Sequence, residues 1–95
     1  MKSGITVIAE ERARQINIEG YTKEHDLLHV NGELANFACC YAIYPKTINA
    51  SLMTLTLKPA NWELTLGHNS PEGRIRDLAK AGALIAAEID RLQGE

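Results

Sequence analysis

The strongest constraint on the fold is an amphipathic pattern near the end of the chain, over residues 71–92. Ser70 followed by Pro71 predicts a helix start, because Ser accepts a hydrogen bond from the first turn and Pro suits the first helical position. Apolar or small residues then recur at alternating spacings of three and four: Ile75, Leu78, Gly82, Ile85, Ile89 and Leu92. This seam predicts that the helix is the packing spine, against another helix of the chain or a second copy.

Two further helices are expected, over residues 5–18 and 23–43. The first ends at Gly20, and its apolar stripe consists of Ile5, Ile8, Ala9, Ala13 and Ile16. The second follows the N-cap residue Thr22, and its stripe consists of Leu27, Val30, Leu34, Ala38 and Tyr41. The pair Asn31-Gly32 either kinks or divides this second helix, since Gly costs about 1 kcal/mol relative to Ala in a helix interior.

A β-hairpin is expected at residues 53–66, where the spacing of apolar residues changes from helical to alternating. Leu55 and Leu57 alternate with threonines before the segment 58–61, which has turn composition. After it, three apolar residues alternate with polar ones: Trp62, Leu64 and Leu66. The expected fold class is therefore mainly α, with about three helices and one hairpin.

The composition describes one small domain over residues 1–95. Ten Lys and Arg against 12 Asp and Glu leave a formal charge of −2, which argues against long nucleic acid as a partner but allows a small anionic ligand. So short a chain buries a limited core, and it has neither a disulfide framework nor zinc-ligand spacing to compensate. We therefore expect a homo-oligomeric helical bundle, assembled through Gly82, Ala83 and Ala86.

The two cysteines and the first residues bear on location. Cys39 and Cys40 are adjacent within an apolar run, so we expect buried, reduced thiols. The apolar stretch after Met1-Lys2 is soon interrupted by charges, which argues against a signal peptide or a membrane span. We expect a cytoplasmic protein with no membrane partner.

Two imidazoles and two carboxylates would share one face of a continuous helix 23–43: His25, Asp26, His29 and Glu33. Such a set could bind a divalent metal, act as a general acid and base, or hydrogen-bond a nucleobase and ribose. The alternative is an ordinary solvated face opposite the apolar stripe. The spacing alone favours the solvated face.

Arginines and lysine form two further groups, with Arg12 and Arg14 in the first helix and Arg74, Arg76 and Lys80 in the last. They suit phosphate, or else ordinary salt bridges on helix surfaces. Trp62 is interpreted as hairpin core, and Tyr21 could cap a pocket. The chain has no glycine-rich phosphate loop, nucleophile elbow or HExxH motif, so no catalytic residue, metal ligand or cofactor is assigned.

Four motifs in order resemble a family of small phage and prophage proteins: ERARQ at 11–15, EGYTKEHD at 19–26, GELA at 32–35 and DLAKAGALIAAEIDRL at 77–92. The resemblance covers about three quarters of the chain. Relatives carry a Trp-rich loop where this chain has residues 52–66. Some are labelled nucleotide pyrophosphohydrolases of the MazG type, which hold Mg²⁺ through ExxE and ExxD pairs. This chain lacks those pairs, because Asn36, Lys80 and Arg91 stand three residues after its acidic residues Glu33, Asp77 and Glu88.

The resemblance implies a phage accessory protein that binds a small nucleotide in the host-cell cytoplasm. In its small size, its expected oligomeric state and its polar helix face with imidazoles and flanking arginines, it also resembles viral proteins that sequester nucleotide immune signals. Those proteins bind cyclic ADP-ribose derivatives or cyclic dinucleotides without cleaving them. The alternatives are a MazG-like pyrophosphohydrolase and a structural protein without a ligand. The expected ligand-binding residues are Arg12, Arg14, Tyr21, His25, Asp26, Glu33 and Lys80, and Gln15 could join them.

Overall fold

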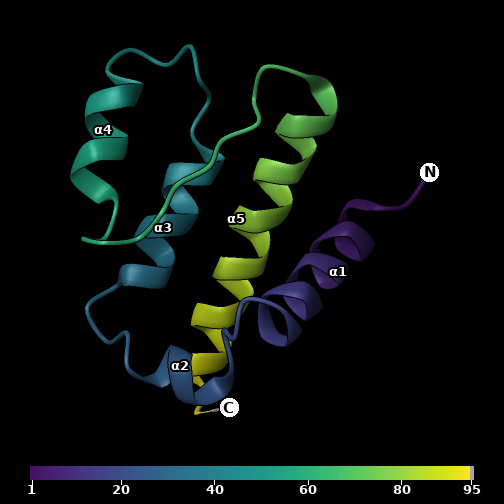
Figure 1. Ribbon diagram of the computed structural model, residues 1–95, viewed down its shortest axis with the longest axis vertical. Coiled ribbons are helices and arrows are strands. Elements are labelled where there is room, and N and C mark those ends of the chain that lie inside the picture. Colours follow the sequence, from purple (N-terminus) through teal and green to yellow (C-terminus); the bar gives the residue numbers. More distant parts are fainter. Residues whose placement is uncertain (95) are drawn as a thin grey trace.

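The computed structural model describes residues 1–94 and contains five helices: α1 (Gly4–Asn17), α2 (Lys23–Leu27), α3 (Glu33–Ala42), α4 (Ala50–Leu57) and α5 (Pro71–Leu92). The mainly helical class is confirmed, three helices is an undercount, and residues 1–94 form no strand. Figure 1 shows α5 at the centre, with α1 on one side and α3 and α4 on the other. The Cα positions span 36 × 35 × 20 Å, and no helix within residues 1–94 is long and apolar enough to cross a membrane.

The predicted helix 71–92 is α5. The Ser70 hydroxyl accepts a hydrogen bond from Gly73 N at 3.0 Å, and Pro71 occupies the first turn. These are the start signals that the sequence carries, since the first helical N–H groups have no partner inside the helix. The helix 5–18 corresponds to α1, which begins one residue earlier because the Ser3 hydroxyl accepts from Thr6 N.

The buried face of α5 differs from the predicted seam. Large apolar residues of that seam are exposed: Ile75, Leu78, Ile85, Ile89 and Leu92. The buried face consists mostly of small residues: Asp77, Ala79, Ala81, Ala83, Leu84 and Ala87. Small side chains let α1 and α3 approach the α5 backbone closely, and this close packing decides which face is covered.

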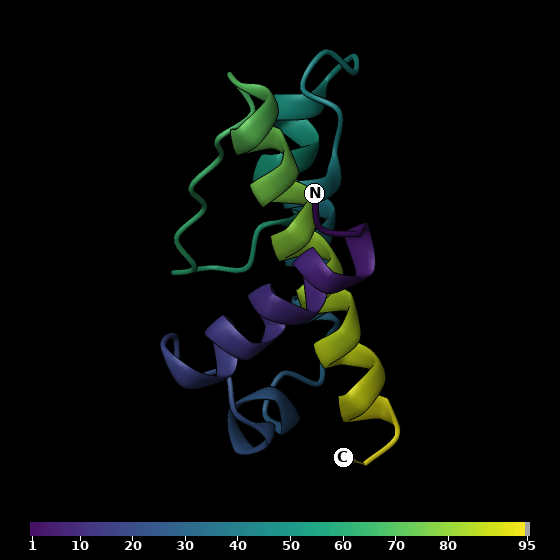
Figure 2. The ribbon, with the colours of Figure 1, turned by 90° about the vertical axis from the view of Figure 1, so that its right-hand side faces the viewer.

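The predicted oligomer face at Gly82 is used within the chain. A Cβ on Gly82 would lie 2.6 Å from Ile8 Cδ1, so α1 crosses α5 where glycine removes the side chain. Ala83 is fully buried. Figure 2 shows α1 running obliquely across α5. On α1 itself the buried residues are Glu11 and Gln15, whereas Ile5 of the predicted stripe is exposed.

The continuous helix 23–43 is wrong, because the chain breaks between α2 and α3. Gly32 has φ +79°, a left-handed conformation that glycine adopts without steric cost, and α3 starts directly after it. Leu28 and Val30 are exposed, so no apolar contact holds the intervening turn in a helix. Thr22 caps α2 as predicted, its hydroxyl accepting from His25 N at 3.4 Å.

The predicted hairpin at 53–66 is also wrong. Residues 50–57 form α4, and the 58–69 segment crosses α3 as an irregular strap between α4 and α5 (Figure 1). Buried and exposed side chains do alternate over residues 62–66. Trp62, Leu64 and Leu66 are partly buried against the core, whereas the residues between them, Glu63 and Thr65, are exposed. The core face is helical, so the segment packs through side chains, and residues 1–94 contain no strand with which it could pair.

The core lies between α3 and α5. It consists of Leu34, Phe37, Ala38, Cys40, Tyr41, Ala81, Leu84 and Ala87. Cys40 is buried as expected, but Cys39 is exposed, because successive helical residues point to different faces. Both cysteines are free thiols.

Candidate functional site

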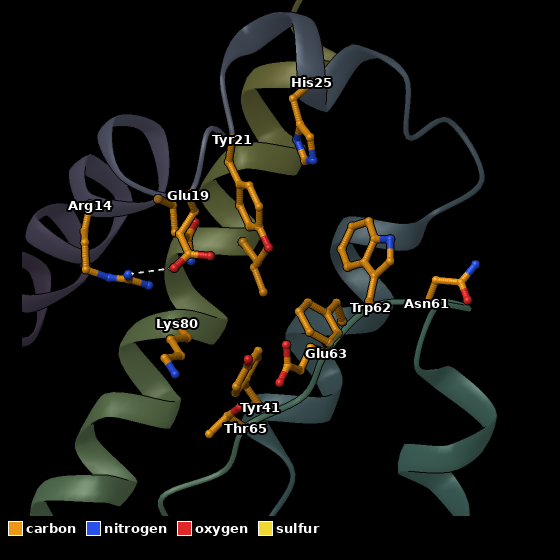
Figure 3. Close-up of a pocket in the computed structure, with 13 residues that line it drawn as sticks. Arg14, Glu19, Tyr21, His25, Tyr41, Asn61, Trp62, Glu63, Thr65 and Lys80 are labelled. Carbon is orange, nitrogen blue, oxygen red and sulfur yellow. Dashed lines mark hydrogen bonds and ion pairs between the residues drawn. The ribbon is translucent and has the colours of Figure 1, made fainter.

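A pocket of about 410 Å³ lies where α1, α2, α3, α5 and the 58–69 segment meet (Figure 3). Its lining combines aromatic rings, charged groups and amides: Arg14, Gln15, Glu19, Tyr21, His25, Phe37, Tyr41, Asn61, Trp62, Glu63, Thr65, Lys80 and Leu84. The volume is within the usual range for small-molecule sites, and several polar groups converge on an aromatic surface. The pocket is therefore the candidate binding site.

Aromatic rings form one continuous wall of the pocket. Tyr21 and His25 stack with ring centroids 4.7 Å apart and planes 2° apart. Trp62 meets Phe37 edge to face at 5.0 Å, and Phe37 meets Tyr41 in the same way. Lys58 Nζ donates to the carbonyl of Trp62 at 2.7 Å and fixes the turn that presents the indole. These flat surfaces suit stacking against an aromatic ligand.

Arg14 is held by two carboxylates. Its Nε and Nη2 donate to Glu11 at 2.8–3.1 Å, and its Nη1 donates to Glu19 at 2.9 Å. These hydrogen bonds raise the pKa of Arg14 further above its usual range and largely neutralise its charge. Figure 3 shows Arg14 joined to Glu19 at the pocket wall. Because both carboxylates already occupy its guanidinium, Arg14 is poorly available to bind an anionic ligand.

Lys80 is the other cation of the pocket. Its Nζ lies 5.2 Å from the centroid of the Tyr41 ring, a cation–π contact. Within the part of the chain that the structure describes, no carboxylate lies within salt-bridge distance of this ammonium. Lys80 is therefore the pocket cation that no carboxylate pairs with directly.

Gln15 presents a buried polar atom without a partner. The residue is 3% exposed, and its Oε1 has no hydrogen bond within residues 1–94. A buried unsatisfied acceptor is costly, and native proteins usually provide it with a donor from protein, water or ligand. Because Gln15 lines the pocket, its amide is suited to a ligand that brings a hydrogen-bond donor.

Two tyrosines supply hydroxyl groups at the pocket. Burial raises the pKa of both Tyr21 and Tyr41, because the charged phenolate is disfavoured away from water. Both phenols therefore stay protonated at neutral pH.

Beside the pocket, a chain of polar contacts connects α1 to the start of α3. Arg12 Nη2 donates to Asp26 Oδ2 at 2.8 Å, and Asp26 Oδ1 lies 2.9 Å from His25 Nδ1. His25 Nε2 lies 3.3 Å from His29 Nε2, and His29 Nδ1 lies 3.4 Å from Glu33 Oε2. Asp26 is 2% exposed, so the interpretation as a solvated face is wrong for this residue, while the other three side chains are partly exposed.

Of the predicted ligand residues, the structure brings Arg14, Tyr21, His25 and Lys80 to the pocket, together with Gln15. Arg12, Asp26 and Glu33 lie outside its lining, in the polar chain beside it. Arg74 donates to the carbonyls of Tyr41 and Ala42 at the end of α3, and Arg76 pairs with Glu11.

The sequence did not indicate Phe37, Tyr41, Glu19 and Glu63 as site residues, and Trp62 was assigned to a hairpin core. Their pattern is that of an ordinary core and an ordinary polar surface. The period-two alternation at 62–66 was the available signal, because it predicts an extended segment with one face inward. Only the packing of that segment across α3 makes the inward face a pocket wall.

The carboxylates required by the pyrophosphohydrolase alternative do not come together. Asp26 pairs with Arg12, Glu33 accepts from Asn31 N at 2.6 Å, and Asp77 accepts from Gly67 N at 2.9 Å. Among residues 1–94, no three His, Cys, Asp or Glu side chains are grouped as a metal-ligand set.

Comparison of the chain with protein-family models, curated proteins and solved structures found no match.

Proposed function

We propose that the protein binds a small nucleotide in the central pocket and holds it without cleaving it. The observation that carries this proposal is the combination, in one pocket, of an aromatic wall, the unpartnered amide of Gln15 and the ammonium of Lys80. A nucleobase stacks on aromatic rings and brings hydrogen-bond donors and acceptors on its edge. A phosphate requires a cation, which Lys80 supplies.

The charges of the pocket favour a ligand with few phosphates. Arg14 and Lys80 face an equal number of carboxylates in the lining, Glu19 and Glu63. A triphosphate would require a clear excess of cations or a metal cage, as in phosphoryl-transfer sites. One aromatic wall also suits one base better than two. Cyclic ADP-ribose and a cyclic dinucleotide each carry two phosphates, so between these signals the single aromatic wall favours the cyclic ADP-ribose type, which has one base.

Sequestration in the cytoplasm of an infected host is the biological role that we propose for this binding. Its support is the resemblance of the four motifs to those of phage proteins, together with a pocket that offers stacking surfaces and hydrogen-bonding groups to an intact ligand. Holding a ligand requires neither an activated water nor a nucleophile.

The first experiment measures thermal unfolding of the chain with adenosine, AMP, cyclic ADP-ribose, a cyclic dinucleotide and ATP. A ligand at 100 times its Kd adds about 2.7 kcal/mol to the free energy of unfolding. Trp62 is the single tryptophan, so its fluorescence reports on the same pocket. We expect the largest stabilisation from a one-base ligand with few phosphates. No stabilisation by any of them would contradict the proposal.

The second experiment recovers the ligand after heat denaturation and analyses it by chromatography. We expect intact ligand. A cleaved product that disappears on adding EDTA would instead favour a metal-dependent hydrolase.

Substitutions locate the site. Trp62→Ala removes a stacking surface and should weaken binding by about 1–3 kcal/mol. Lys80→Ala removes the charged partner of the phosphate and should cost a similar amount. Lys46→Ala is the matched control, since this exposed lysine lies outside the pocket lining and should leave the Kd unchanged.

We also propose that the chain self-associates, through the large apolar residues of the predicted α5 seam and not through Gly82, Ala83 and Ala86. Exposed apolar residues of α5 lie at spacings of three and four on either side of the α1 crossing: Ile75, Leu78, Ile85, Ile89 and Leu92. Their spacing is that of a helix-packing seam, and a second copy would cover it. Light scattering at micromolar concentration tests this, and Ile85→Glu with Ile89→Glu should convert an oligomer into a monomer.

A further inference from the structure

We propose that His25 and His29 form a binding site for a transition-metal dication such as Zn²⁺, with their two Nε2 atoms as its protein ligands. The Nε2 atoms face each other at 3.3 Å, and the two ring planes make an angle of 62°. Two nitrogens that each lie 2.0–2.1 Å from a tetrahedral zinc ion are about 3.3–3.4 Å apart. The observed separation matches that of two neighbouring ligands of one ion.

The opposite nitrogen of each ring faces a carboxylate. His25 Nδ1 lies 2.9 Å from Asp26 Oδ1, and His29 Nδ1 lies 3.4 Å from Glu33 Oε2. A metal-binding histidine usually donates its second ring N–H to a carboxylate, which fixes the tautomer and makes the free nitrogen a better ligand. Here both histidines have that partner, and both therefore present Nε2 as the ligand atom.

The surrounding residues hold the pair in place. Asp26 is fixed by Arg12 at 2.8 Å, and Glu33 is fixed by Asn31 N at 2.6 Å. Tyr21 stacks on His25, and Trp62 lies edge to face with His29 at 4.9 Å. The imidazoles are thus oriented before an ion arrives, which lowers the entropic cost of binding.

The site is open. The side chains of His25 and His29 are 30% and 20% exposed, so an ion can reach them from solvent. Two imidazoles leave the other coordination positions to water or to an outside ligand. Imidazole nitrogens favour Zn²⁺, Ni²⁺, Cu²⁺ or Co²⁺ over Mg²⁺ and Ca²⁺, which prefer oxygen.

The experiment titrates the full chain with Zn²⁺ alone by calorimetry at neutral pH. Co²⁺ absorption gives an independent measure of coordination. We expect saturable binding of one ion per chain. Because the probe is metal without nucleotide, failure here leaves the nucleotide proposal intact, and the reverse also holds.

Variants identify the ligands. His25→Ala and His29→Ala should each lower the affinity for Zn²⁺ more than loss of an outer carboxylate does, and Glu33→Gln should lower it about 10-fold to 100-fold. His68 is the only other histidine, so His68→Ala is the matched control and should change nothing. Cys39→Ser controls for the exposed thiol in the same way.

Three outcomes would overturn the proposal: no saturable binding to the wild-type chain, unchanged affinity in the double variant His25→Ala/His29→Ala, or loss of binding in His68→Ala or Cys39→Ser. Circular dichroism checks that each variant is folded. If a histidine variant is unfolded, Glu33→Gln decides, because this partly exposed carboxylate can be neutralised with little change in shape.

Discussion

Arg12 on α1 and Asp26 on α2 form a buried ion pair, with Arg12 Nη2 2.8 Å from Asp26 Oδ2. The side chains are 14% and 3% exposed, and Asp26 also orients His25. Arg12 Nη1 further donates to the carbonyl of Tyr21 at 3.4 Å. One guanidinium therefore joins α1, the turn that carries Tyr21, and α2.

The first prediction concerns this pair. Arg12→Ala leaves a buried carboxylate without its partner and should lower the free energy of unfolding by about 3 kcal/mol, measured by urea denaturation. Lys2→Ala breaks the exposed pair with Glu10, in which both side chains are more than half exposed, and should change stability by less than about 0.5 kcal/mol. Equal effects of the two substitutions would show that the buried pair contributes no more to the free energy of unfolding than the exposed pair does.

The second prediction concerns close backbone packing. A Cβ on Gly73 would collide with the backbone carbonyl oxygen of Gly67, whereas a Cβ on Gly82 would meet side-chain atoms of Ile8, which can shift more easily than backbone. Gly73→Ala should therefore destabilise the chain more than Gly82→Ala, which we expect to cost about 1–3 kcal/mol. Gly4→Ala is the control, because nothing lies within 4 Å of that position.

Shortening Ile8 tests the Gly82 contact directly. In the double variant Ile8→Ala/Gly82→Ala the added methyl has room, so the two effects should not add. Strict additivity in urea denaturation would mean that the two side chains do not meet.

The third prediction concerns Glu33 and pH. Its own backbone N–H and that of Asn31 donate to the carboxylate and lower its pKa below 4.5. Because the native pKa is below the unfolded one, the carboxylate stabilises the fold above about pH 4.5, and this contribution is lost as pH falls through the native pKa. The difference in unfolding free energy between wild type and Glu33→Gln should shrink on acidification. A difference that stays constant from about pH 7 to pH 3 would contradict this.

The fourth prediction concerns the adjacent thiols. Burial raises the pKa of Cys40 above 9.0, because the thiolate is disfavoured in the apolar core. Cys39 is exposed. We expect one fast and one slow reaction with a thiol reagent at pH 8, and mass spectrometry of peptides should assign the fast one to Cys39. Cys39→Ser should abolish the fast phase alone, and two equally fast thiols would show that Cys40 is accessible.

The sequence by itself determined where α2 and α5 begin. Ser70-Pro71 and Thr22 act through their own backbone and side-chain chemistry, so these two starts could be read locally. Gly32 marked a point at which the expected helix 23–43 could divide, but neither the end of α2 nor the helix α4 was predicted. The cluster of His25, Asp26, His29 and Glu33 was also visible from spacing, although a turn and a short helix bring it together.

The tertiary structure decided which faces are covered and where the pocket lies. Periodicity predicted that Ile75 and Ile85 lie in a seam that packs against another helix or a second copy, but within the chain the helices pack against Ala81 and Ala87, because small side chains allow closer approach. Trp62 alternates like a strand residue, and yet the described part of the chain offers no strand for pairing. Gln15 and Trp62 become pocket residues only when α1 and the 58–69 segment pack around α3 and α5. Local patterns report backbone conformation, whereas burial depends on contacts between segments far apart in the chain, and those contacts form only in the complete fold.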